Sequence, residues 1–206
     1  YYFFTLYANT DGVTAKFRTD SDQLLDRYIL AKTHQLVVDV QGDLDSYDLA
    51  GSCQRVTSFL EALNNWYIRR SRDRFWKEEK DQDKQDAYDT LFSVLTTLCR
   101  TAAPLLPLLT EEVYRGLTGE RSVHLVDWPE ASSLPADPDL VADMDRARDA
   151  CSVALGLRES HKLRTRLPLA SLTVAGSGSD RLGLFAHLIT DEINVKELKF
   201  SDAIEQ

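Results

Sequence analysis

Apolar side chains recur at steps of three and four residues through most of the chain, which is the pattern of amphipathic helices. This spacing predicts one long helix with Ser21 as its N-cap, followed by helices over residues 47–74, 83–103 and 110–117. Pro104 and Pro107 predict the end of the third of these helices. The apolar stripe of the second helix ends at Tyr67, where a run of arginines begins.

The last quarter of the chain has a different pattern. A loop rich in proline and small residues is predicted at 129–138, before a helix at 139–162. Short segments then predict a strand at 172–175, a helix at 181–193 and a strand at 195–200. We therefore predict a mainly α fold, with an antiparallel helical bundle over residues 1–164 and a small β-α-β appendage over residues 165–206.

Charge is distributed unevenly along the chain. The formal net charge of −9 over 206 residues argues against a nucleic-acid binder. Two basic runs depart from this average: Arg69, Arg70, Arg72, Arg74 and Lys77 form the first, and Arg158, Lys162, Arg164 and Arg166 form the second. An acidic body with basic patches attracts a polyanion at one place and repels it elsewhere, which favours one docking orientation.

Cysteine and histidine positions give no metal site. Cys53, Cys99 and Cys151 lie far apart, and the four histidines show no ligand spacing. We therefore expect reduced cysteines, mostly in the core, and a cytoplasmic protein. Apolar stretches stay far below the roughly 20 residues that cross a bilayer. The opening residues lack an initiator Met and the features of a targeting peptide, so we expect a piece cut from a longer protein.

Catalytic residues are not predicted anywhere in the chain. No nucleophile–base pair can be assembled from the sequence, and Gly176-Ser-Gly-Ser179 lacks the lysine of a phosphate loop and is interpreted as a turn. His161 lies in the second basic run and could donate to a phosphate, although a surface histidine without a role is the simpler interpretation.

The most informative segment is Asn64-Asn-Trp-Tyr-Ile-Arg-Arg-Ser-Arg-Asp-Arg-Phe-Trp76. On a helix, Arg70, Arg74 and Lys77 stand at positions i, i+4 and i+7, a row of cations that could follow a phosphate backbone. Trp66 and Trp76 lie beside this row and could stack on bases splayed from an RNA loop. Periodicity alone favours a plainer interpretation, in which Trp66 belongs to the core and the arginines form a solvated face.

This segment resembles the arginine-rich Trp-Tyr helix of isoleucyl-tRNA synthetases. Further blocks resemble that family in the same order: Phe3 to Gly12, Ala103 to Tyr114 with its Pro-x-x-Pro and Glu-Glu, Ser122 to Pro129, and Glu192-Ile-Asn-Val-Lys-Glu197. The proline, Glu-Glu and Trp-Pro elements also occur in related valyl, leucyl and methionyl synthetases, whereas the arginine-rich helix and the Asn-Val-Lys-Glu segment indicate isoleucine. The nucleotide-binding signatures of the family, His-Ile-Gly-His and Lys-Met-Ser-Lys-Ser, are absent.

The resemblance implies a tRNA anticodon-binding region without the catalytic domain. It implies contact with the anticodon stem and loop of isoleucine tRNA through the two basic runs and Trp76, with no cofactor here and ATP and Mg²⁺ used by the parent ligase. The remainder of the synthetase chain is the other expected partner. Two alternatives stay open: the anticodon domain of a valyl-type synthetase, and a helical protein-interaction domain, which the net charge favours.

Overall fold

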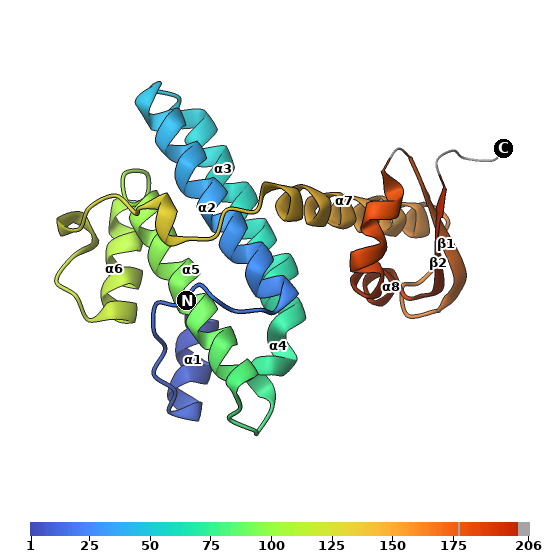
Figure 1. Cartoon of the computed structure of the whole chain (residues 1–206), viewed down its shortest axis with the longest axis horizontal. Helices are drawn as coiled ribbons and strands as arrows, with labels where there is room; N and C mark the ends of the chain where they lie inside the picture. Colours follow the sequence, from blue (N-terminus) through green and yellow to red (C-terminus); the bar gives the residue numbers. More distant parts are fainter. Residues whose placement is uncertain (177, 202–206) are drawn as a thin grey trace. The chain divides into compact units, whose positions relative to one another are not determined.

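The computed structural model describes residues 1–176 and 178–201, and most of these residues are helical (Figure 1). The helices and the small sheet near the C-terminal end confirm the predicted mainly α class with an α/β appendage. The chain divides into two compact units, Tyr1–Pro138 and Asp139–Gln206. The division thus falls before the last long helix, not after residue 164 as expected. Arg158 gives the physical reason, because its guanidinium bonds that helix to carbonyls of the following segment.

The first unit is a bundle of antiparallel helices. Its helices are α1 (Tyr2–Asp11), α2 (Leu24–Asp45), α3 (Leu49–Glu61), α4 (Arg69–Trp76), α5 (Gln82–Ala102) and α6 (Pro107–Thr118). Figure 1 shows α2 and α3 side by side as a hairpin, and α5 packs against α2. Asp81 caps α5 by accepting a hydrogen bond from the Lys84 amide at 2.9 Å. Tyr88 and Leu91 of α5 are fully buried, so α5 is the central helix of this unit.

Helices α3 and α4 form one continuous helix, as the apolar stripe predicts. A π-helical turn at Ala62–Ile68 joins them. A π turn holds one more residue than an α turn, so it rotates the residues that follow relative to those before it. Trp66 and Tyr67 lie within this turn and are both buried, at 4% and 0% exposure.

Helix α1 was not predicted from the sequence. Its N-cap, Tyr1, makes no side-chain capping bond, and its aromatic residues are poor helix formers in isolation. Packing stabilises the helix instead: the ring of Phe3 lies 5.1 Å from that of Phe75, and Phe4 lies 6.0 Å from Tyr88. Tertiary contacts therefore outweigh local propensity at this end of the chain.

Two predicted helix starts are wrong. Helix α2 begins at Leu24, and Ser21 precedes it without capping it, because the Ser21 hydroxyl instead donates to Asp26 at 2.7 Å. Helix α6 begins at Pro107, not at Thr110 as expected, so Pro107 opens α6, and α5 has already ended at Ala102. Proline suits the first turn of a helix because the backbone N–H it lacks would have no partner there.

The second unit contains helix α7 (Pro138–Ser160) and a β-α-β segment. This segment runs through strand β1 (Leu169–Ala175), a 3₁₀ turn (Ser179–Phe185), helix α8 (Ala186–Ile193) and strand β2 (Val195–Ser201). The strands pair in parallel, with Leu169 opposite Val195. Asn194, in the left-handed conformation at φ 52°, ends α8 and turns the chain directly into β2. The predicted order of strand, helix and strand is confirmed.

Candidate nucleic-acid interface

Arg74 points into the first unit and meets a buried carboxylate. Its Nη1 and Nη2 donate to the two carboxylate oxygens of Asp26 at 2.7 and 2.9 Å, and its Nε donates to Asp83 at 2.8 Å. Asp26 also accepts hydrogen bonds from the hydroxyls of Tyr67 at 2.9 Å and Ser21 at 2.7 Å. The Asp26 side chain is 0% exposed and that of Arg74 is 17% exposed. Arg74 therefore joins α4 to α2 and α5.

This buried carboxylate fixes the protonation of its neighbours. Burial raises the pKa of Tyr67 well above its usual value, and the charge of Asp26 raises it further. Burial by itself lowers the pKa of Arg74, but the hydrogen bonds and charge of Asp26 outweigh this effect and raise it. Tyr67 is consequently neutral and Arg74 charged at neutral pH, as their hydrogen bonds to Asp26 require.

Lys77 also has carboxylate partners within the first unit. Its Nζ lies 2.8 Å from Asp81 and 2.8 Å from Asp83, and its side chain is 27% exposed. The expected row of Arg70, Arg74 and Lys77 is therefore not presented to solvent as a row. The spacing of cations along one helix could not reveal these ion pairs, because the carboxylates come from α2 and from the start of α5.

A different set of residues forms the exposed face of α4. Arg69, Arg72 and Trp76 stand at i, i+3 and i+7, and all three are exposed. The Arg72 guanidinium lies 6.0 Å from the centroid of the Trp76 ring, and 51% of Trp76 is exposed. Arg69 Nε donates to the Asn65 carbonyl at 2.8 Å. We name these three side chains the α4 face; Asp73 is the exposed acid beside them.

Arg70 has a more enclosed position than the α4 face. Its guanidinium lies 4.2 Å from the centroid of the buried Trp66 ring, a cation–π contact. Both arginine–tryptophan pairs are four residues apart, Trp66 with Arg70 and Arg72 with Trp76. The same spacing thus occurs in one enclosed pair and one exposed pair, so it does not by itself identify the side of the helix that faces solvent.

Arg158, from the second basic run, is a buried structural residue. Only 4% of it is exposed. Its Nη1 donates to the Ile193 carbonyl at 3.1 Å, and its Nη2 donates to the carbonyls of Leu167, at 2.6 Å, and Arg164. A planar guanidinium with several donors suits this task, since it satisfies three carbonyls from two segments. Arg158 therefore holds the segment after α7 against the end of α8.

The other cations of the second run stay at the surface. Lys162, Arg164 and Arg166 are exposed on the segment that joins α7 to β1, and we call them the basic loop. None of the three forms a side-chain ion pair within the described residues. Lys162 adopts a left-handed backbone at φ 57°, which reverses the chain at the end of α7. The structure thus separates the second run into one structural arginine and three exposed cations.

Over residues 1–176 and 178–201, no cluster of three or more His, Cys, Asp or Glu side chains has the geometry to hold a metal ion. Cys99 and Cys151 are buried, whereas Cys53 is exposed. No helix among the described residues is sufficiently long and apolar to span a membrane.

Comparison with known proteins gives matches over the whole chain. The isoleucine–tRNA ligase of Corynebacterium efficiens is 53% identical over 205 residues, which is 100% of this chain and 19% of that protein. The isoleucine–tRNA ligase of Mycobacterium tuberculosis is 52% identical over the same shares. That of Rickettsia bellii is 40% identical over 227 residues, 100% of this chain and 20% of that protein.

The chain thus spans about a fifth of the length of these curated relatives. A family model described as the anticodon-binding domain of tRNA ligase matches residues 26–174, which include the α4 face and the basic loop. This match covers well over half of the chain and agrees with the resemblance found in the sequence. The chain therefore belongs to the family of anticodon-binding domains of tRNA ligases.

Proposed function

We propose that this chain binds the anticodon stem and loop of isoleucine tRNA, as one region of a longer isoleucine–tRNA ligase. The α4 face carries the proposal, because it presents two arginines and a half-exposed tryptophan outward from a chain of net charge −9. The names of the relatives favour isoleucine over a valyl-type ligase. The family also disfavours an unrelated protein-interaction domain.

Each exposed group has a role in the proposed contact. Arg69 and Arg72 bind phosphates, which sets the position of the RNA without reading its sequence. Trp76 offers a ring face to an unpaired base, and Arg72 beside it limits the rotation of that ring. The basic loop gives a second contact to the RNA backbone. Arg70 supports this surface from its position on Trp66, while Arg74, Lys77 and Arg158 maintain the fold.

The chemistry of the proposed parent ligase lies outside this chain. That enzyme would activate isoleucine with ATP and Mg²⁺ and transfer it to the tRNA, and no described residue takes part in that reaction. Holding the anticodon end raises the effective concentration of the acceptor end at the distant catalytic domain. The described cysteines form no disulfide, which favours a reducing compartment, so we propose that the protein acts in the cytoplasm.

A titration with isoleucine tRNA at 50 and 200 mM salt tests whether the contact is with a polyanion. About five phosphate contacts predict an affinity loss of roughly a hundredfold between these conditions, because bound cations displace condensed counterions. The affinity would be measured by fluorescence anisotropy of labelled tRNA. An affinity that hardly changes with salt would contradict the proposal and restore the protein-interaction alternative.

A further inference from the structure

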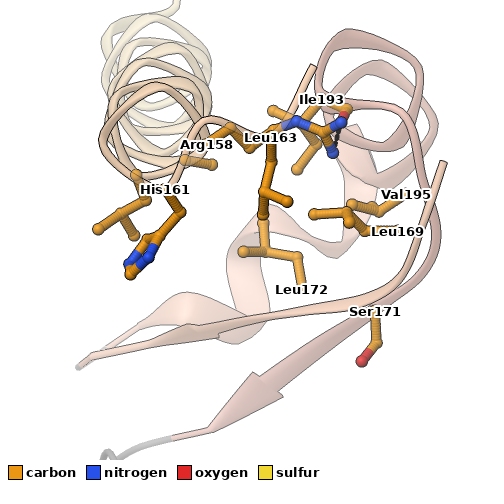
Figure 2. A pocket seen from close by; sticks show the side chains of 10 residues that line it. Arg158, His161, Leu163, Leu169, Ser171, Leu172, Ile193 and Val195 are labelled. Atoms are coloured by element: carbon orange, nitrogen blue, oxygen red, sulfur yellow. Dashed lines mark hydrogen bonds between the residues drawn. The ribbon is translucent and has the colours of Figure 1, made fainter. Parts of the chain in front are cut away.

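The second unit contains a small apolar recess that the proposed phosphate contacts do not use. It lies between the last turns of α7 and the beginnings of β1 and β2, as Figure 2 shows. Its volume is about 120 Å³, and its walls include Leu157, Leu163, Leu169, Leu172 and Val195. Leu157 and Leu163 are 55% and 42% exposed, so the recess opens to solvent along these two side chains.

One wall of the recess holds a buried donor without an acceptor. Arg158 lines the recess, and its Nη1 and Nη2 are used by carbonyls of the chain. Its Nε has no hydrogen-bond partner among the described residues. A buried N–H without an acceptor is costly, and a ligand that supplies an oxygen or nitrogen removes that cost. A purely hydrocarbon side chain in the recess would leave this donor unsatisfied.

The basic loop lies beside the recess. His161 and Leu163 line the recess, and Lys162 and Arg164, which flank Leu163 in the chain, line a neighbouring hollow that shares Leu163. Glu159 also lines that hollow, and Glu197, opposite Ser171 in the sheet, is paired with Lys199 at 3.3 Å. The three cations of the basic loop therefore exceed the one acid, Glu159, beside them.

We propose that the recess holds one unstacked base of the RNA single strand whose phosphates contact the basic loop. A base combines apolar ring faces with acceptors at its edge, which matches apolar walls with one buried donor. Its phosphates match the cations beside the recess. The small volume fits one ring system, since pockets for drug-sized ligands start at roughly 300 Å³. This inference rests on the proposed function and adds a base-binding site in the second unit.

A pair of tryptophan substitutions on β1 tests the proposal. Leu172 lines the recess, and Figure 2 shows its side chain facing Leu163. Thr173, the next residue, points to the opposite face of the strand, is exposed and does not line the recess. Leu172→Trp fills the recess, and Thr173→Trp adds the same side chain outside it. Strands accept tryptophan readily, so both variants should fold, which circular dichroism would verify. A second variant, His161→Ala, removes a ring from the opening without adding volume.

Each protein would be titrated with the anticodon stem-loop, intact and with single loop nucleotides made abasic. We expect Leu172→Trp to bind the intact RNA about tenfold more weakly than the unmodified chain, and Thr173→Trp to bind it equally well. For one loop position, the abasic RNA should bind the unmodified chain about tenfold more weakly than the intact RNA does. Leu172→Trp should bind that abasic RNA and the intact RNA with the same affinity, because its contact with the base is already lost. His161→Ala should lose affinity only for RNAs that carry that base.

Three outcomes would overturn this inference while the proposed function stands. In the first, Leu172→Trp binds every RNA as the unmodified chain does. In the second, the loss of affinity caused by Leu172→Trp and the loss caused by each abasic site add. In the third, Leu172→Trp spares RNA binding but prevents docking of another protein segment in the full-length ligase. Failure of the unmodified chain to bind tRNA with a salt dependence would instead remove the proposed function itself.

Discussion

Replacing Arg74 with Ala should lower the free energy of unfolding by about 3–5 kcal/mol, the range measured when one partner of a buried ion pair is removed. The substitution leaves the carboxylate of Asp26, which is 0% exposed, without its two guanidinium bonds. Tyr67 and Ser21 remain as donors to Asp26, but neither carries a compensating charge. Such a loss is a large part of the stability of an ordinary domain, roughly 5–15 kcal/mol.

Arg72→Ala is the matched control for this prediction. It removes the same side chain two residues earlier on α4, from an exposed position, and should change stability by no more than about 0.5 kcal/mol. Urea unfolding followed by circular dichroism measures both variants. Arg74→Lys should also be destabilised, because an ammonium group cannot reproduce the two parallel bonds to Asp26. Equal stability of the two alanine variants would show that Arg74 does not hold the bundle together.

Replacing Lys162, Arg164 and Arg166 together with Ala should weaken tRNA binding by about a hundredfold near 0.1 M salt. Each phosphate contact in a single strand contributes roughly 0.7 to the slope of log affinity against log salt, so three lost contacts make the slope about two units shallower. Stability should hardly change, because the three side chains are exposed and make no ion pair within the described residues.

A triple variant of the first unit controls for net charge. Lys16, Arg115 and Arg121 are exposed cations outside both the α4 face and the basic loop. Changing these three residues to Ala alters the net charge of the chain by the same amount as the triple substitution in the basic loop. This control should leave the salt slope within about half a unit of its original value. If both triple variants reduce the slope of log affinity against log salt by the same amount, the basic loop contributes only through the overall charge of the chain and makes no specific contact.

Much of the fold could be predicted because long apolar stripes determine it. Helix α5 was predicted within a residue at each end, and its inward residues, such as Tyr88 and Leu91, are buried. Both strands of the appendage also lie where alternation placed them. Helix α1 escaped prediction because its N-cap, Tyr1, makes no side-chain capping bond and the helix depends on aromatic contacts with α4 and α5.

The candidate site was harder to predict, because one helix does not determine which of its cations have distant partners. Arg74 meets Asp26 across 48 residues of sequence, and Arg158 meets Ile193 across 35. Both arginines belong to basic runs that look uniform in the sequence. The exposed arginines of these runs, such as Arg72 and Arg164, differ from Arg74 and Arg158 only in the residues that the fold places next to them. Sequence therefore located the basic runs, and the three-dimensional structure sorted their residues.

Recognition of the anticodon is tested most directly by titrating the chain with isoleucine tRNA transcripts that differ at single anticodon bases. We expect at least one such change to weaken binding by about tenfold, since a base contact in a single-stranded loop is worth roughly 1–3 kcal/mol. A change in the acceptor stem of the same tRNA should have no effect on the affinity. Equal affinity for all anticodons, with the salt dependence retained, would show that the chain binds tRNA without recognising its anticodon and would contradict the proposed function.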